Sequence, residues 1–572
     1  MHSWEPMKNS YLWGATPTAE PIPMGTIIGD RYQVIAPNIW LDNSPQVLPS
    51  VKEPIPEEVF PYLRLYPYRL HLPEVQTVVE VAPATNILLL DNVPIETNGS
   101  LMPSIIEAWA EASSVRKVNW LWQILELWEP LEVLQVVSSL LIPENLRVDG
   151  WRVRLVQLDL ENPNPGELGM QKLGRSWQDW FSSIQSPINP ELDRIYQLLQ
   201  VANISLSEVK EQLNQLLLLE AQGNSFQVKV AGGTDIGAQR RQNEDCCYPV
   251  AADFESNRFL ASHLAIVSDG VGGHDAGEVA SHLAVSSMKL QVQALLRELA
   301  LNQELITPDV ITEILATSVR VTNNLIMARN DEQSRNLRQR MATTLVMALQ
   351  LPQSSGEVYI VHVGDSRAYW LSREGIVQLT VDDNVMTEVV SEGKSFMASA
   401  ITRKDAAALT QALGVQAGEL LNPRVNRFMV EEEGLLLLCS DGLSDNELLE
   451  LHGAEYARQV LSGEKSVNEA LKSLIEFANE YNGHDNISVV LTHFKAGLPQ
   501  DSPELTPVIP EAKSAPPQPT PKPNHQTSWI LTFVIAGLAI AGTVILALAM
   551  LSDRVPKPQP SQSQESGVRS NN

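Results

Sequence analysis

Hydrophobic runs from distant parts of the chain each border on an aspartate, and this pattern limits the fold more than any other feature of the sequence. Asp269 follows LAIVS, Asp365 follows VYIVHVG and Asp441 follows LLLLCS. Asp485 precedes ISVVL, and Asp245 ends the stretch RRQNED. Most of these aspartates have a glycine nearby, so the backbone can bend sharply beside them. If the runs are strands of packed sheets, their ends can meet at one edge of the fold.

Carboxylates that meet in this way repel one another unless cations lie between them. Two unit charges about 4 Å apart repel by about 4 kcal/mol at an effective dielectric constant of about 20. That energy is a large part of the stability of a whole domain. Carboxylates, backbone carbonyls and water suit Mg²⁺ or Mn²⁺, whereas no cluster of histidines and cysteines indicates zinc. Each aspartate alone fits an ordinary turn, but five at strand ends favour a metal centre.

Length, charge and cysteine content restrict the remaining possibilities. A chain of 572 residues is too long for one hydrophobic core, so two or more domains are expected. The formal net charge of −27 argues against binding to nucleic acid, which requires basic surfaces. Three cysteines without a CxxC spacing predict no disulfide framework and indicate a reducing compartment.

An apolar segment near the C-terminus predicts a transmembrane helix. Residues 529–551, WILTFVIAGLAIAGTVILALAML, carry no charge and would extend about 34 Å as a helix, enough for a bilayer core of about 30 Å. We expect a Pro-rich linker over 496–526, a transmembrane helix over 527–551 and a disordered tail over 552–572. Flanking charges leave the orientation open. No signal peptide is expected at the N-terminus, which lacks a basic region followed by an apolar one.

Residues 226–495 alternate between strand-like and helical segments. Strands are expected within 225–233, 263–270, 343–351, 356–365, 434–442 and 485–494, and long helices over 277–300 and 310–330. The runs VYIVHV and LLLLCS are apolar almost throughout, which predicts central strands that are buried on both faces.

Eight stretches of this region resemble, in order and spacing, the metal-dependent protein phosphatases of type 2C (the PPM family) in their bacterial form. They are TDIGAQRRQNED, VSDGVGGHDAGEVAS, RMATTLVMAL, VHVGDSRAYWL, QLTVDD, LTQALG, LLLCSDGLSD and GHDNISVVL. The resemblance implies an α+β fold whose catalytic domain is an α-β-β-α sandwich of two antiparallel sheets flanked by helices. It also implies a protein serine/threonine phosphatase that uses two Mn²⁺ or Mg²⁺ ions, with a third, weaker site. Its substrates would be phosphoproteins made by Ser/Thr kinases.

The resemblance assigns roles to single residues. Those expected to hold the ions, directly or through water, are Glu244, Asp245, Asp269, Gly270 by its carbonyl, Asp365, Asp441 and Asp485. Asp269 would bridge two ions, and Asp365 would join Asp441 in the third site. Arg240 corresponds to the phosphate-binding arginine and His274 to the proton donor for the leaving group. Arg240 could instead be a surface residue like its neighbour Arg241, and His274 a locally bonded residue at a helix start.

The implied reaction is a direct attack on phosphorus by hydroxide that the ions generate from water. Arg240 would stabilise the developing charge, and His274 would protonate the departing seryl or threonyl oxygen. The alternative function is a non-catalytic receptor or scaffold that uses the fold only for binding. The complete set of carboxylates disfavours that alternative.

Three features depart from the family pattern. Ala342 stands in place of the usual glycine in M-G-T-T, with Arg340 in place of a small residue before it. Asp383 stands where a histidine is common after LTxD. Residues 384–408, which correspond to the flap that shapes substrate access, have an unusual sequence. None of these departures removes an expected metal ligand.

Residues 1–222 are expected to form an N-terminal α/β regulatory domain with an unknown ligand or partner. GTIIGDRYQVI resembles the opening strand of bacterial Ser/Thr kinases, and IPENLRVDGWRVRLVQLD resembles their catalytic-loop hairpin. On this alignment Leu140 and Gln157 replace the catalytic and metal-binding aspartates, and only Asn145 is kept. The domain would therefore be kinase-like and inactive, or else an unrelated α/β domain. We expect the whole chain to be a single-pass membrane protein whose catalytic domain lies in the cytoplasm.

Overall fold

The computed structural model describes residues 11–15, 22–82, 85–160, 169–271, 276–301, 306–335, 339–352 and 356–497. None of the helices within these ranges is both long enough and apolar enough to cross a membrane. The linker, the transmembrane helix and the tail expected after residue 497 lie outside the described residues. Contacts group the chain into units 1–507 and 508–572. The predicted division near residue 222 remains a prediction.

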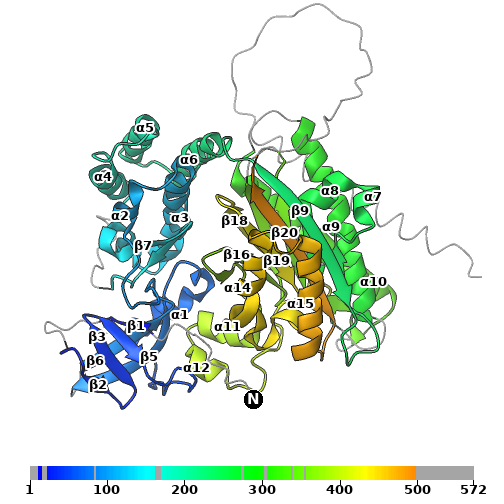
Figure 1. Ribbon diagram of the computed structural model, residues 1–572, viewed down its shortest axis with the longest axis horizontal. Coiled ribbons are helices and arrows are strands. Elements are labelled where there is room, and N and C mark those ends of the chain that lie inside the picture. The colour runs from blue at the N-terminus through cyan, green and yellow to red at the C-terminus, as the bar shows by residue number, and fades with distance from the viewer. Residues whose placement is uncertain are drawn as a thin grey trace, which may run out of the picture. The chain divides into compact units, whose positions relative to one another are not determined.

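The chain begins with a six-stranded antiparallel sheet in the order β2-β3-β4-β1-β6-β5. Its strands are β1 (Tyr11–Ala15), β2 (Ile27–Ile28), β3 (Tyr32–Ala36), β4 (Ile39–Asp42), β5 (Glu74–Ala82) and β6 (Thr85–Asp91). The segment between β4 and β5 contains the short helices α1 (Phe60–Arg64) and η2 (Tyr66–Tyr68). Strand β1 thus lies in the interior of this sheet, between β4 and β6. The sheet is drawn in blue in Figure 1.

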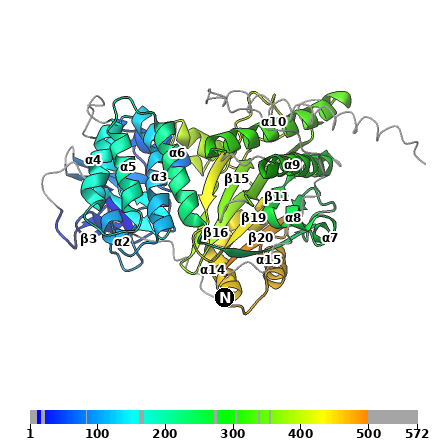
Figure 2. The ribbon, with the colours of Figure 1, turned by 90° about the horizontal axis from the view of Figure 1, so that it is seen from above.

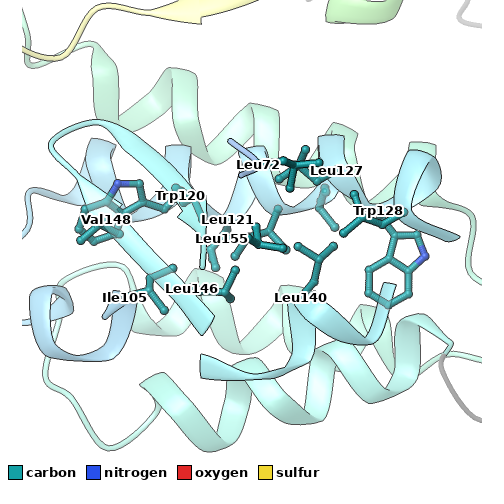
Figure 3. Packing of buried hydrophobic residues seen from close by; sticks show 14 of the residues in the cluster. Leu72, Ile105, Trp120, Leu121, Leu127, Trp128, Leu140, Leu146, Val148 and Leu155 are labelled. Carbon is teal, nitrogen blue, oxygen red and sulfur yellow. The ribbon is translucent and has the colours of Figure 1, made fainter. Parts of the chain in front are cut away.

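Helices and one hairpin follow this sheet. They are α2 (Ile105–Trp109), α3 (Ser114–Val133), the hairpin β7 (Leu146–Asp149) and β8 (Arg152–Leu155), α4 (Met170–Phe181), α5 (Asn189–Leu199) and α6 (Leu206–Ala221). Helix α3 starts where the Ser113 side chain accepts a hydrogen bond from the amide of Arg116. Its buried residues 120, 121, 124, 125 and 128 recur at helical spacing. They pack on the hairpin and on the segment that precedes it, where Leu140 is fully buried (Figure 3).

Two five-stranded antiparallel sheets form the second half of the fold. The first has the order β10-β11-β14-β15-β18, with β10 (Cys246–Tyr248), β11 (Leu264–Ser268), β14 (Leu345–Gln350), β15 (Glu357–Val363) and β18 (Arg424–Met429). The second has the order β17-β16-β19-β20-β9, with β17 (Ile376–Gln378), β16 (Arg367–Leu371), β19 (Gly434–Cys439), β20 (Ile487–Ala496) and β9 (Phe226–Asp235). Apolar residues of both sheets, such as Ile360 and Leu438, meet in one core between them.

Helices cover the outer face of each sheet (Figure 2). Helices α9 (Ala276–Leu301) and α10 (Pro308–Glu332) contact the first sheet, and α14 (Leu448–Leu461) and α15 (Val467–Tyr481) contact the second. Helix α15 begins with a capping box, in which Ser466 and Glu469 each bond the backbone of the other. The expected α-β-β-α sandwich and the α+β fold class are therefore confirmed.

The six predicted strands and both long helices are present with small shifts at their ends. Every residue of β15 and β19 is buried, as the continuous apolar runs predicted. Strands β10, β16, β17 and β18 were not among the predicted segments. Strand β18, RVNRFM, mixes polar and apolar residues because it lies at the edge of its sheet.

The N-terminal part and the sandwich share hydrophobic contacts. Trp151, in the turn of the β7–β8 hairpin, belongs to the core between the two sheets and meets the Phe428 ring edge-on at 4.8 Å. Conversely, Val390, Phe396 and Ala400 of the sandwich half belong to the core of the N-terminal part.

Candidate metal centre

Asp269 directly follows β11, and two threonines fix its backbone. The Thr343 hydroxyl donates to the Asp269 carbonyl at 2.7 Å, and the Thr344 amide donates to the same oxygen at 2.8 Å. The Asp269 amide in turn donates to the Thr344 hydroxyl at 3.0 Å. These bonds determine where the Asp269 carboxylate leaves the end of the strand.

Gly270 lies where the backbone has no room for a side chain. A Cβ on Gly270 would come within 2.4 Å of the Glu244 carbonyl oxygen and of Gly277 at the start of α9. A Cβ on Gly277 would lie 2.7 Å from the Gly270 carbonyl oxygen and 3.0 Å from the Glu244 carboxyl carbon. The Gly270 carbonyl and the Glu244 carboxylate, both predicted ligands, therefore lie close together beside the first turn of α9.

Asp441 and Asp485 are brought together by the close packing of two loops. Asp441 begins the short helix α13 (Asp441–Ser444), and only Ser440 separates it from the end of β19. A Cβ on Gly442 would lie only 2.0 Å from the Asn486 carbonyl oxygen. The Asn486 side chain also accepts from the Glu244 amide at 2.9 Å. One asparagine thus connects three segments that carry predicted ligands.

Asp245 is almost completely buried, with 3% of its surface exposed. Its Oδ2 accepts a hydrogen bond from the Ser440 hydroxyl at 2.7 Å. Within the described ranges, its Oδ1 has no hydrogen-bond partner, and neither does the buried Oδ1 of Asp441. Buried carboxylate oxygens without partners are costly, and a cation is the natural counter-charge for them.

The electrostatics of the site show that the aspartates converge. Burial raises the pKa of Asp269 well above its usual range, and repulsion from Asp245, Asp441, Asp365 and Asp485 raises it further. Burial also raises the pKa of Asp245 and of Asp441. Burial and then the nearby Asp441 raise the pKa of Asp365 to about 8. These carboxylates oppose one another's ionisation, as expected of ligands that share cations.

Asp365 lies in the turn between β15 and β16, one residue after Gly364. Gly364 has a φ of +102°, and a Cβ there would lie 2.8 Å from the Thr344 side chain. The turn therefore packs directly on the threonine that holds Asp269, which brings Asp365 to the same end of the sandwich.

Arg240 takes part in the cluster as a cation. Its Nη2 lies 2.5 Å from Asp485 Oδ2, and its Nε donates to the His484 carbonyl at 3.1 Å. Among the described residues, no group of three or more acidic, histidine or cysteine side chains is arranged so that it could hold a metal ion. One physical reason is that Asp485 faces Arg240 in this arrangement. His274 lies outside the described residues.

Residues 237–491 match the sequence model of the family described as protein phosphatase 2C. Over 258 residues the chain is 33% identical to the serine/threonine phosphatase stp of Listeria innocua, an alignment that covers 45% of this chain and 92% of that protein. The chain belongs to the protein phosphatase 2C family. It is a metal-dependent serine/threonine phosphatase of the bacterial type.

Two further comparisons concern the mycobacterial phosphatase PstP. This protein phosphatase 2C chain is 30% identical to PstP of Mycobacterium tuberculosis over 268 residues. The alignment covers 46% of this chain and 44% of PstP. A crystal structure of the catalytic domain of PstP in complex with two manganese ions matches with 28% identity and a TM-score of 0.36. That match covers 47% of this chain and the whole of the PstP domain.

Three positioning residues of the phosphatase were missed by the sequence analysis, namely Thr343, Thr344 and Asn486. The signal was present, because small hydroxyl and amide side chains stand next to or within the recognised motifs. Of the departures from the family pattern, Ala342 is buried and pairs with Val271 in the short ladder of β12 (Gly270–Val271) and β13 (Ala342–Thr343). Arg340 donates to the Gly414 carbonyl at 3.2 Å.

Proposed function

We propose that this chain is a membrane-anchored protein serine/threonine phosphatase with a binuclear metal centre and a regulatory N-terminal domain. The observation that carries the proposal is the convergence of Asp245, Asp269, Asp365, Asp441 and Asp485 at one end of the sandwich. Two of these side chains have buried oxygens that no residue in the described part of the chain bonds. Cations among the members of such a carboxylate cluster would relieve their mutual repulsion.

The predicted ligands would hold the ions together. Asp269 lies at the centre of the cluster, since all four other aspartates act on it. Glu244 and the Gly270 carbonyl lie close together, and Asp441 and Asp485 both act on Asp269. When bound, the ions would activate a water for attack on phosphorus and neutralise charge on the phosphoryl group.

Two side chains would act on the substrate itself. Arg240 presents a planar fork of donors that matches phosphate oxygens. It would leave Asp485 for the substrate once a cation neutralises that carboxylate. His274, at the start of the segment that leads into α9, would protonate the departing seryl or threonyl oxygen, which is a poor leaving group as an alkoxide.

The N-terminal domain would sense or bind and would not transfer phosphate. Leu140, at the position of a kinase's catalytic aspartate, is a buried core residue (Figure 3). The Gln157 side chain, at the position of a metal-binding aspartate, accepts a hydrogen bond from Trp13 Nε1 at 2.9 Å. Asn145 bonds the backbone of Ser139 and Gln157. These contacts support a kinase-like domain without a catalytic base or metal ligand.

Membrane anchoring rests on the uncharged run over 529–551 alone. A catalytic domain that acts on phosphoproteins belongs in the cytoplasm, so the tail over 552–572 would lie across the membrane from it. Expression of the full chain in cells, followed by alkaline carbonate extraction, tests the anchor. The protein should stay with the membrane, and release into the supernatant would contradict the anchor.

The activity is tested with the purified full-length chain and a phosphothreonine peptide. Chelation should stop phosphate release and Mn²⁺ should restore it. No turnover with Mn²⁺ or with Mg²⁺ would favour the scaffold alternative.

A further inference from the structure

The flap of this phosphatase is held by the N-terminal domain. The flap (residues 384–408) contains the helices α11 (Val385–Ser391) and α12 (Met397–Ala400). Helix α11 lies beside α1 and η2, and α12 lies beside β5 (Figure 1). Between the two helices, Gly393 has a φ of +76°, and a Cβ there would lie 3.1 Å from Phe60 Cδ1 in α1.

The flap helices depend on this packing. Seven and four residues are too few for helices that are stable in water, so tertiary contacts must hold them. Val390, Phe396 and Ala400 are fully buried, and they are buried in the core of the N-terminal part. The order of the flap is therefore supplied to a large extent by residues 60–82.

A second contact anchors the N-terminal domain to the edge of the first sheet. Arg116 in α3 bonds Glu431 and Glu432 at 2.8 Å each, and Asn119 bonds Glu431 at 2.6 Å. These acidic residues lie in the turn between β18 and β19. Because this anchor does not involve the flap, a change at Phe60 should loosen the flap without releasing the whole domain.

Asp383 connects the flap to the loop that carries Asp365. Asp383 precedes Asn384, whose side chain caps α11 by accepting from the Thr387 amide at 3.0 Å. The Gly364 amide donates to Asp383 Oδ2 at 3.0 Å, and the Asp383 amide donates to the Gly364 carbonyl at 2.9 Å. Arg424 of β18 lies 3.3 Å from Asp383 Oδ1 and supplies its counter-charge. The start of the flap and the turn before Asp365 are thus bonded in both directions.

We propose that the N-terminal domain restrains the flap through Phe60, and that Asp383 transmits this restraint to the Asp365 loop as a positioning residue of the metal centre. The inference rests on the proposed function, in which Asp365 is a metal ligand. A signal received by the N-terminal domain would then change metal affinity at Asp365 and access for protein substrates. The flap and the Asp383 carboxylate would thus connect the regulatory domain to the metal centre.

The test compares amide hydrogen exchange in the full-length chain and its Phe60→Ala variant. Exchange in α11 and α12 should become at least about tenfold faster, while exchange in α15 stays unchanged. Phe259→Ala, which removes an exposed phenyl ring from α8 (Arg258–His263), should leave the flap as it is. Phe60→Leu keeps most of the apolar contact and serves as a control in case Phe60→Ala unfolds the protein. Its exchange rate in the flap should lie between those of the wild-type chain and Phe60→Ala. Unchanged exchange in the flap of both Phe60 variants would overturn the restraint.

A double-mutant cycle tests the role of Asp383. Asp383→Asn should accelerate exchange at residues 363–366 and raise the Mn²⁺ concentration for half-maximal activity by about threefold to tenfold. Phe60→Ala should raise the same concentration, and the double variant should raise it less than the product of the two single effects. Multiplicative effects, or unchanged exchange at 363–366, would overturn the coupling. If the wild-type chain itself showed no Mn²⁺-dependent turnover, the proposed function would be refuted instead.

Discussion

Arg116 and Glu431 form an ion pair across 315 residues of sequence, with Arg116 Nε 2.8 Å from Glu431 Oε2. The Glu431 side chain is 1% exposed, and Asn119 bonds its second oxygen. This pair fastens α3 to the turn between β18 and β19 of the phosphatase sandwich. It also shows that residues 226–495 alone would expose a carboxylate and apolar side chains that are buried in the full chain.

Arg116→Ala should destabilise the full-length chain by about 2–4 kcal/mol, because it leaves the Glu431 carboxylate buried without its cation. Urea unfolding of the two proteins measures the difference. Arg194→Ala is the matched control, because Arg194 is highly exposed and its ion pair with Glu191 is long, at 3.8 Å. The control should change stability by less than about 0.5 kcal/mol. Equal effects of both substitutions would show that the Arg116 pair does not anchor the domain.

Glu431→Gln should flatten the dependence of stability on pH. Burial raises the pKa of Glu431 to about 7, although the bonds from Arg116 oppose this rise. Between about pH 4.5 and 7 the folded chain keeps a proton that the unfolded chain has lost. Stability from this group is therefore full below about pH 4.5 and decreases as pH rises, by at most about 1.4 kcal/mol per pH unit.

Melting temperatures of the wild-type chain and Glu431→Gln, measured from pH 5 to 8, give the two slopes. The variant should lose less stability than the wild-type chain over this range. Parallel curves would mean that Glu431 keeps its ordinary pKa in the folded protein.

Asp269→Asn and Asp441→Asn should each lower Mn²⁺-dependent turnover by at least about 100-fold, because an amide cannot supply the charge that the ions require. The fold should persist, since each substitution removes a mutual repulsion. Circular dichroism and phosphate release measure the two effects. Asp193→Asn, on the exposed face of α5, should leave both unchanged. Retained turnover in either site variant would refute the metal assignment.

Arg240→Ala should raise KM for a phosphothreonine peptide by about tenfold and lower kcat less, because the guanidinium would contact phosphate in both ground and transition states. Arg241→Ala serves as the control, since it changes the neighbouring exposed arginine. The steady-state parameters of the two variants decide the assignment. If Arg241→Ala had the larger effect on KM, the phosphate contact would belong to Arg241.

Short-range patterns predicted the parts of the fold that depend on neighbouring residues. The apolar runs before Asp269, Asp365 and Asp441 became buried strands. Long-range pairing had no such signal. Arg116 and Glu431 are ordinary charged residues in the sequence, and only the packing of two distant parts makes them a pair. The same is true of Phe60 and Gly393.

The candidate site shows a similar division. The family motifs identified the aspartates, whereas Thr344 and Asn486 were missed because their role is to hold backbone. The bond between Arg240 and Asp485 was also not predicted, since it joins two residues that had been given separate roles. The role of His274 and the transmembrane helix over 527–551 remain predictions.

The most direct test is a crystal structure of the protein grown with Mn²⁺, with anomalous scattering used to locate the ions. We predict two Mn²⁺ ions among Asp245, Asp269, Asp441 and Asp485, with the Asp485 carboxylate turned from Arg240 towards an ion. A map in which these carboxylates stay apart and no manganese peak lies among them would contradict the metal centre.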